Sequence, residues 1–469
     1  MIQPLRHPPS RFSRVAIVGG GPGGLLTAFF LQREAARPIH VTLFEASSRL
    51  GGKVLTPAFS SAPIRYEAGA AELYDYTPVG EDPLRDLIEE FGLPITPLNG
   101  SAVMMGDHSI ANLDDIERRL GPSARHSLEA FDLRARGAMT PREFYAADES
   151  GAGPPGPFAA VVNGITHDAT RHYVEALIHS DLATEPDLTS VSYGLQNYLM
   201  NDPAYMRLYC IAGGNEQLID ALRARLDAEV RLTARVEAVA RSPSGGHQLT
   251  VRTPSGTSSE EFDAVVLALP MQHLAGLRFE DHDLDAAMRR HRAQFDHPAH
   301  YLRVTALFDE PFWRGRIDGA YVMLDAFGGC CLYDESSRDP DPRHGVLGWL
   351  LGGAAAAEWS NADDDTLVAA ALDSLPPSFG DPRAHLMEAR VHHWAGAVSA
   401  LPGGWRPPGV DRRHQPDPRH HPTLFVVGDY LFDSTLNGVL DSAEHVAGWL
   451  ASLAGCDDPR SRLTTKPSP

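Results

Sequence analysis

The stretch that decides the fold is VAIVGGGPGGLLTAFFLQREAARPIHVTLFE, residues 15–45. A β-branched run enters a glycine cluster, apolar residues then follow at helical spacing, and a second strand-like run ends at Glu45. Strand, tight turn, helix and strand in this order form a βαβ unit. The sequence therefore predicts an α/β fold with a doubly wound parallel sheet that starts near the N-terminus.

The glycine cluster predicts a dinucleotide site, because Gly19, Gly21 and Gly24 have the GxGxxG spacing. The first glycine permits the turn, the second lets backbone amides approach a pyrophosphate, and the third lets the helix pack on the strand. The helix N-terminus adds partial positive charge. Glu45 ends the second strand, where its carboxylate can accept hydrogen bonds from a ribose and would repel a 2′-phosphate. This favours FAD or NAD over NADP.

Composition excludes several function classes. The 469 residues carry 41 Lys and Arg against 61 Asp and Glu, a net charge of −20, which disfavours binding to nucleic acid or anionic membranes. The four cysteines show no CxxC or Cys/His metal spacing, and we expect no metal site. The most apolar stretch is interrupted by glycines, and no leader pattern precedes it. We expect a cytoplasmic protein.

Strand-like and helix-like sequence alternate in blocks, which predicts a discontinuous nucleotide domain with a second domain inserted in it. Helical patterns dominate from Asp82 to about Arg207, strand patterns return after that, and the run HYLRVTALFDEPFW alternates with an arginine on one face. The nucleotide domain is predicted at 12–80, 208–290 and 386–456. The second domain, a mixed sheet with a helical cap, is predicted at 81–207 and 291–385. Flexible tails are predicted at 1–11 and 457–469.

Further motifs resemble the flavin-containing amine oxidase superfamily. SSRLGGKV at 47–54 is similar to the RxGGR segment that follows the dinucleotide fingerprint there, with Lys53 in place of the second arginine. GGNEQLIDAL, FDAVVLALP and GDYLFDSTLNGVLDSA are similar to the family at matching places. The resemblance spans nearly the whole chain. It implies a Rossmann-like FAD-binding domain, a substrate domain and oxidation of a C–N bond.

The resemblance also implies the cofactor contacts. It places Asp429 near the ribityl-pyrophosphate region of FAD and Val236 as a backbone contact to adenine. The alternative for Asp429 is an ordinary turn residue, and the alternative for Val236 is a core valine. No cysteine stands in AGAVSA before Pro402 or in the final motif, so we expect non-covalent FAD. The predicted cofactor-binding residues are Gly19, Gly21, Gly23, Gly24, Glu45, Arg49, Gly52, Lys53, Val236, Gly428, Asp429 and Leu436.

Two departures from the family pattern supply the candidate catalytic residues, Glu72 and Arg303. Arg303 stands where many members have a lysine that holds a water beside the flavin. Arginine stays protonated, so it can donate a hydrogen bond but cannot act as a base. Glu72 stands where amino-acid oxidases carry an arginine for the substrate carboxylate, which favours a cationic or amide-like substrate or a proton acceptor. The alternative for Arg303 is a strand arginine that pairs with a carboxylate at the surface, and the alternative for Glu72 is a surface glutamate.

The substrate contacts are less clearly marked in the sequence. The aromatic pair expected around the amine is not apparent, and Thr435 falls where a tyrosine is expected. The predicted substrate-binding residues are Glu72, Tyr74, His179, Tyr198, Trp394 and Thr435. Core packing is the alternative for the histidine and the aromatic residues. The segment DRRHQPDPRHHP, 411–422, is interpreted as an exposed loop and not as a metal site.

These observations predict an FAD-dependent oxidoreductase. The favoured reaction converts a C–N bond of an amine, amino-acid-derived or amide-containing substrate to an imine, with O2 as acceptor and H2O2 as product. A specialised metabolite is favoured, since the arginine for a substrate carboxylate and the aromatic pair around the amine are both missing. A C–C desaturase of the same fold and a non-catalytic flavin-binding protein remain alternatives. The expected partners are a small-molecule substrate and O2, with a homodimer as a further expectation.

Overall fold

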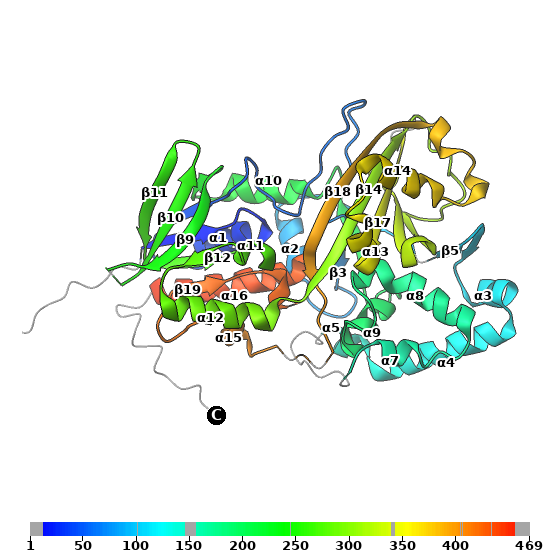
Figure 1. The fold of residues 1–469 in the computed structure, drawn as a ribbon, viewed down its shortest axis with the longest axis horizontal. Coiled ribbons are helices and arrows are strands. Elements are labelled where there is room, and N and C mark those ends of the chain that lie inside the picture. Colours follow the sequence, from blue (N-terminus) through cyan, green and yellow to red (C-terminus); the bar gives the residue numbers. More distant parts are fainter. Residues whose placement is uncertain are drawn as a thin grey trace, which may run out of the picture. The chain divides into compact units, whose positions relative to one another are not determined.

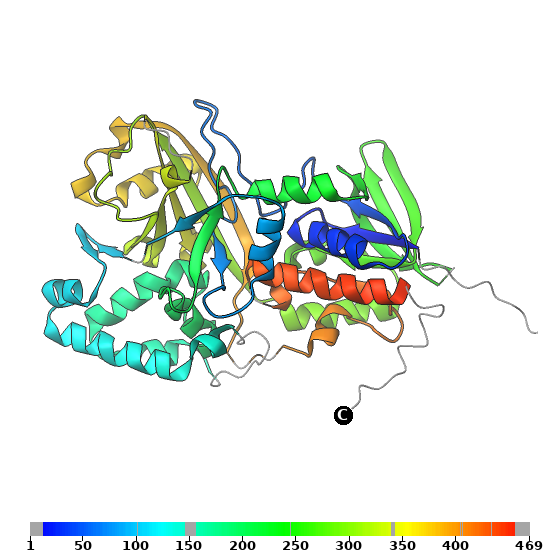
Figure 2. The same cartoon turned by 180° about the vertical axis from the view of Figure 1, so that it is seen from behind.

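A computed structural model describes residues 13–100, 102–145, 156–243, 245–338, 343–403, 405, 407–432 and 434–454. The predicted tails, 1–11 and 457–469, lie outside the described residues. The chain forms two compact units, drawn in Figures 1 and 2. Unit 1 comprises Met1–Gly52, Ile219–Asp296 and Pro408–Pro469, and unit 2 comprises Lys53–Leu218 and His297–Pro407.

Unit 1 is built on a five-stranded sheet in the order β19-β12-β1-β2-β8, and every neighbouring pair in it is parallel. The predicted βαβ unit is confirmed as β1 (Arg14–Val18), α1 (Pro22–Glu34) and β2 (His40–Phe44). The strands that complete the sheet are β8 (Glu229–Arg231), β12 (Ala264–Leu267) and β19 (Leu424–Val426). Helix α16 (Leu436–Ala454) packs against α1. This is the expected Rossmann-like arrangement.

A second sheet in unit 1 has the order β11-β10-β9-β13. Its strands are β9 (Arg235–Arg241), β10 (His247–Thr253), β11 (Gly256–Phe262) and β13 (Arg278–Phe279). Unit 1 also holds α11 (Met271–Leu274), α12 (His282–Phe295), α15 (Val410–His414) and the 3₁₀ turn η5 (Asp429–Leu431), while α10 (Glu216–Arg225) begins in unit 2.

Unit 2 contains a seven-stranded mixed sheet in the order β18-β14-β17-β16-β15-β5-β6. Its strands are β5 (Val103–Met105), β6 (His108–Ile110), β14 (Pro298–Phe308), β15 (Tyr321–Leu324), β16 (Cys330–Asp334), β17 (Gly345–Gly352) and β18 (Leu386–Ser399). Short helices follow the strands: η1 (Ala326–Gly328), η2 (Glu335–Ser337), α13 (Gly353–Trp359), α14 (Asp364–Asp373), η3 (Pro377–Phe379) and η4 (Pro382–Ala384).

Strand β14 is buried on both faces from Leu302 to Phe308, so the alternative of an arginine paired at the surface is wrong. Arg303 and Thr305 have no exposed area. The alternate positions Leu302, Val304 and Ala306 belong to one apolar cluster. On the other face, Leu307 packs with an apolar cluster from the segment 59–68. The segment 59–68, far from β14 in the sequence, therefore covers the face that carries Arg303, which the alternating pattern of β14 does not predict.

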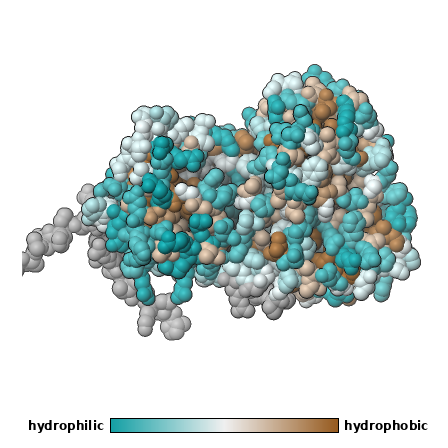
Figure 3. All heavy atoms as spheres, in the orientation of Figure 1, coloured by the Kyte–Doolittle hydropathy of each residue, from teal (hydrophilic) through white to brown (hydrophobic). Residues whose placement is uncertain are grey.

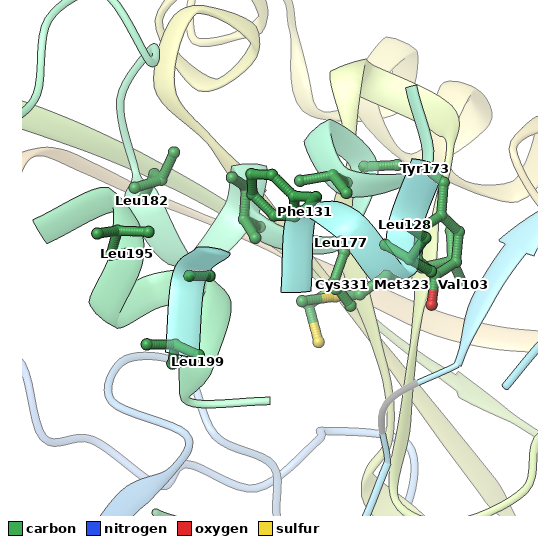
Figure 4. Close-up of a cluster of buried hydrophobic side chains, with 14 of the residues drawn as sticks. Val103, Leu128, Phe131, Tyr173, Leu177, Leu182, Leu195, Leu199, Met323 and Cys331 are labelled. Atoms are coloured by element: carbon green, nitrogen blue, oxygen red, sulfur yellow. The ribbon is translucent and has the colours of Figure 1, made fainter. Parts of the chain in front are cut away.

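The helical cap of unit 2 is confirmed, but it is interrupted by strands. Its helices are α2 (Pro83–Glu90), α3 (Leu113–Leu120), α4 (Pro122–Ala138), α5 (Pro141–Tyr145), α7 (Ala159–Val162), α8 (Asp168–Leu182) and α9 (Val191–Leu199). Figure 4 shows Leu128, Phe131, Leu177, Leu195 and Met323 in their shared apolar cluster. The predicted helical stretch also contains β5 and β6 and the strand β4 (Ile95–Leu98) of a three-stranded sheet ordered β3-β7-β4. Strands this short carry almost no periodic signal.

The units divide the chain at other points than the predicted domains do. Strand β18 pairs along its length with β14, which joins the stretch from Leu386 to Pro407 to unit 2. Strand β3 (Leu73–Asp75) pairs with β7 (Arg207–Ile211), both in unit 2. Long-range strand pairing sets these limits, and composition gives no sign of it.

The surface visible in Figure 3 is mainly hydrophilic, with hydrophobic residues scattered among polar ones, as expected for a chain with 22% charged residues. Within the described part of the chain, no helix combines the length and apolar character needed to cross a membrane.

Candidate functional site

The glycine turn between β1 and α1 contains a space that the protein itself does not fill. A Cβ added at Gly24 would collide with the carbonyl oxygen of Gly19, so packing requires a glycine there. At Gly21 the nearest atom to an added Cβ is the Cα of Gly52, 3.8 Å away, so packing alone would tolerate a side chain. No side chain caps α1, which leaves its first amide groups available. The turn suits a diphosphate that occupies this space.

A second glycine turn closes on the first. The amide of Gly51 donates to the carbonyl of Gly20 at 2.8 Å, and Gly52 has a φ of +53°. Arg49 lies beside this turn and donates to the carbonyls of Leu50 and Gly52. Arg49 therefore braces the turn, and the two turns together form the glycine cradle, residues 19–24 and 49–52.

Glu45 follows β2 and is oriented by backbone amides. Its Oε2 accepts from Gly20 at 2.8 Å and its Oε1 from Ser47 at 2.7 Å. Each oxygen keeps a second lone pair for a ribose hydroxyl. The amide of Ala234 donates to the carbonyl of Glu45, which brings the start of β9, and with it the half-buried Val236, alongside. The predicted adenosine contacts thus lie together at one edge of the cradle.

Other predicted cofactor residues are placed as follows. Gly23 is in the first turn of α1, where its carbonyl accepts from Thr27 at 2.7 Å. The amide of Gly428 donates to Ser442, and Asp429 is buried at the start of η5. Leu436 is the first residue of α16. Lys53 lies in unit 2, and its ammonium donates to the carbonyl of Ala397. None of these contacts tests a role toward a cofactor.

Glu72 is brought close to a second carboxyl group, Asp181, in the interior of unit 2. Both side chains retain some accessible surface, but burial is the largest cause of the raised pKa of each, and their mutual repulsion adds to that of Asp181. The hydroxyl of Tyr333 donates to Glu72 at 2.8 Å. The pKa values of the surrounding tyrosines are raised by burial and by these two carboxyls. The interior acidic cluster consists of Glu72, Asp181, Tyr74, Tyr193, Tyr301, Tyr321 and Tyr333.

Arg303 belongs to a buried charge network next to this cluster. Its guanidinium pairs with Glu335, which is 3% exposed, and its other donors, Nε and Nη1, find no hydrogen-bond partner among the described residues. The second oxygen of Glu335 accepts from the amide of Glu67 at 2.9 Å. Burial raises the pKa of Glu67 to about 7, although the charge of Arg338 opposes this. Arg303 is thus paired with a carboxylate, but in the interior and not at the surface.

The other predicted substrate residues do not all join the acidic cluster. His179 on α8 uses both ring nitrogens, contacting the Gly329 carbonyl at 3.1 Å and Glu185 at 3.0 Å. Burial alone would lower the pKa of His179, but the hydrogen bond and charge of Glu185 raise it. Tyr198 donates to Asp132 at 3.1 Å between α9 and α4.

The last two predicted substrate residues lie on β18 and directly before α16. Trp394 on β18 is in register with Tyr301 of the cluster and donates to the carbonyl of Ala68 at 2.7 Å. Thr435 is in unit 1, where its hydroxyl accepts from the amide of Gly438 at 3.1 Å. It therefore acts as the N-cap of α16.

The interpretation of 411–422 as an exposed loop is wrong. His414 has no exposed area and contacts Ser442 at 3.0 Å, and His421 is 2% exposed and contacts Asp281. Burial lowers the pKa of His414 to about 3, so its ring is neutral. Among the described residues no group of His, Cys, Asp and Glu could hold a metal ion. These histidines pack unit 1.

Sequence reasoning missed most of the acidic cluster and its support. Asp181 lies two residues after His179 on α8, so a helix turns the two side chains to different sides. Its only sequence signal was its place in the run HSD. Nothing in the sequence distinguishes the tyrosines at 193, 301, 321 and 333 from core residues. Tyr321 and Tyr333 are cross-strand partners on β15 and β16, Tyr301 lies on β14, and Tyr193 lies on helix α9.

Comparison with known proteins agrees with this geometry. A family model described as flavin-containing amine oxidoreductase matches residues 22–449. A putative flavin-containing monoamine oxidase of Mycobacterium tuberculosis is 23% identical over 94% of this chain and 96% of its own length. A flavin-dependent L-tryptophan oxidase of Lentzea aerocolonigenes is 26% identical over 67% of this chain and 69% of its own length. The solved cyclohexylamine oxidase of Brevibacterium oxydans shares the fold, with a TM-score of 0.72, 19% identity and coverage of 95% of this chain and 100% of that one.

Proposed function

Since the chain belongs to the flavin-containing amine oxidoreductase family, we propose that it oxidises a C–N bond of a cationic amine to an imine. It is an FAD-dependent oxidoreductase. The finer proposal is that the amine is amino-acid-derived or amide-containing, that it belongs to specialised metabolism, and that O2 is the acceptor.

The glycine cradle fits FAD, because the space at Gly21 is one that a Cβ would fill and packing leaves it open. Gly21, the uncapped start of α1 and Glu45 would hold the diphosphate and the adenosine ribose. Bound FAD would supply the hydride acceptor for the amine oxidation, with O2 as the final acceptor and H2O2 as the product. Every other step that we propose belongs to side chains of this chain.

The observation that carries the proposal is the carboxylate of Glu72 among tyrosine rings. A carboxylate attracts an ammonium group, and aromatic faces stabilise it further. We propose that Glu72 binds the ammonium and then accepts one of its N–H protons, which leaves a neutral amine and a protonated carboxyl. The neutral amine can release hydride, whereas the ammonium cannot. A carboxylate at position 72 would repel a substrate carboxylate, which argues against a simple α-amino acid.

The test mixes anaerobic holoprotein with amines, amino acids and amides and follows the absorbance of the oxidised flavin. We expect a cationic amine to bleach it and aerobic turnover to give H2O2. Glu72→Gln should slow bleaching about 10- to 100-fold with FAD still bound, because a charged hydrogen bond of ~1.5–3 kcal/mol is lost. The exposed Glu81→Gln serves as the matched control.

Normal bleaching by Glu72→Gln would remove this residue from the mechanism. A product with a new C=C bond and no imine would favour a desaturase. Failure of every compound to bleach the flavin would favour a flavin-binding protein without catalysis.

A further inference from the structure

Tyr333 stands between two cations and the carboxyl group of Glu72. The guanidinium carbon of Arg303 lies 4.9 Å from the centre of the Tyr333 ring, and that of Arg338 lies 5.4 Å from it. Tyr333 is 1% exposed, and both arginines are almost fully buried. Its hydroxyl donates to Glu72. Two positive charges therefore polarise the ring whose O–H bond points to this carboxylate.

The two arginines are themselves held in place. Arg303 pairs with Glu335, and Arg338 donates to the carbonyl of Ala71, the residue before Glu72. The amide of Glu67 donates to the same Glu335. The network thus fixes the backbone before Glu72 as well as the ring that binds its carboxylate.

Asp181 has none of this support. No described residue donates a hydrogen bond to its carboxyl group, and burial followed by the nearby charge of Glu72 raises its pKa well above the ordinary value. The raised pKa of Glu72, in contrast, is opposed by the Tyr333 hydrogen bond, Arg338 and Arg303. Two buried carboxyl groups that repel each other do not readily ionise together. Their surroundings therefore decide which one keeps the proton.

We propose that Tyr333, whose ring contacts the guanidinium groups of both Arg303 and Arg338, is a positioning residue that keeps Glu72 ionised while Asp181 carries the proton. The titratable and charged groups that face this pair are Tyr74, Tyr301, Tyr321, Cys331, Tyr333, Arg303 and Arg338.

The pair thus presents one negative charge and one hydrogen-bond donor. This part of the inference rests on the proposed function: a monocationic amine with a hydrogen-bond acceptor near the amine matches the site, and a dication would meet only one countercharge. Arg303 then acts on the substrate through Tyr333 and Glu72.

Infrared absorbance of the holoprotein in H2O and D2O tests where the proton resides, without any substrate. A protonated carboxyl has a C=O band that shifts in D2O. We expect one such band to shift again in protein grown with aspartate labelled with ¹³C at the side-chain carboxyl, and to vanish in Asp181→Asn. Glu67 contributes a separate band, which Glu67→Gln identifies. A band that responds to labelled glutamate and persists in Glu67→Gln, with none that responds to labelled aspartate, would overturn the proposal.

Tyr333→Phe tests the positioning role, since it keeps the ring and removes the hydroxyl. Loss of the hydrogen bond should raise the pKa of Glu72 and shift the acid limb of kcat/KM to higher pH by about one unit. The control is Tyr209→Phe, because the buried Tyr209 hydroxyl has no partner among the described residues. An unchanged limb would overturn the role of Tyr333. If no substrate is found, the infrared experiment still decides, because a band assigned to Glu72 should grow in Tyr333→Phe.

Charge matching is measured with a monoamine and a diamine of equal chain length, by their perturbation of the oxidised flavin absorbance. We expect the monoamine to bind at least as tightly as the diamine. Tighter diamine binding that Asp181→Asn abolishes would mean that both carboxyls are ionised and would overturn the inference.

Discussion

The glycine cradle and the interior acidic cluster are assembled in opposite ways. All residues of the cradle lie between Gly19 and Gly52, and its main contacts are backbone hydrogen bonds between neighbouring turns. The cluster draws Glu72, Asp181 and Tyr333 from a loop, a helix and a strand that are far apart in sequence. The first depends on the absence of side chains, and the second on a few buried polar side chains whose charges must balance. Substitutions should therefore affect the two regions differently.

The largest effect is expected in the cradle, from Gly21→Val. The added side chain occupies the space that we assign to the diphosphate, and among the described residues its Cβ meets only the Cα of Gly52 within 4 Å. We expect the Kd for FAD to rise at least about ten-thousandfold, ~5.5 kcal/mol, with little loss of stability in the cofactor-free protein. Flavin absorbance after gel filtration and thermal unfolding followed by circular dichroism measure the two quantities.

Gly137→Ala, in α4 of unit 2, is the control, since an added Cβ there meets no atom within 4 Å. Retention of FAD by Gly21→Val would show that the diphosphate does not occupy the space at Gly21, and the proposed role of the glycine cradle would then be wrong.

An intermediate effect is expected in the charge network, from Glu335→Gln. The substitution removes the carboxylate that pairs with the buried guanidinium of Arg303. Breaking a buried pair on one side costs about 3–5 kcal/mol, whereas the exposed Arg383–Asp373 pair should lose under ~1 kcal/mol in Asp373→Asn. Urea unfolding of both variants gives the comparison, and similar losses would contradict the assigned role of burial.

The smallest effect is a pH dependence from Glu67. Its folded pKa of about 7 exceeds the unfolded value of 4.5, so the folded state binds more protons between these values. The stability that the protonated carboxyl contributes is complete below pH 4.5 and is lost as the pH rises through 7. The free energy of unfolding should fall by about 2–3 kcal/mol more in the wild type than in Glu67→Gln over this range. Parallel pH profiles in urea unfolding would show that Glu67 ionises normally.

The sequence was sufficient where local rules govern structure. The βαβ unit follows from periodicity and glycine spacing, and the parallel sheet follows from the βαβ unit. The family motifs extended this to the discontinuous arrangement. Arg303 could be identified as unusual, but its burial depends on the segment 59–68 covering β14, and its partner Glu335 lies two strands away in the sheet order. Asp181 was passed over for His179 because only the helix phase of α8 separates their surroundings. Strand pairing between distant segments and the helical phase of α8 therefore determine which residues form the interior acidic cluster.

The parallel sheet of unit 1 has a consequence for synthesis on the ribosome. Strand β12 lies between β1 and β19, and β19 is translated only after the last residue of unit 2. Until then one edge of β12 has unpaired backbone groups, and an open edge is the kind of surface that chaperones shield. Unit 2 is therefore expected to mature first on the nascent chain, before the parallel sheet of unit 1 is complete.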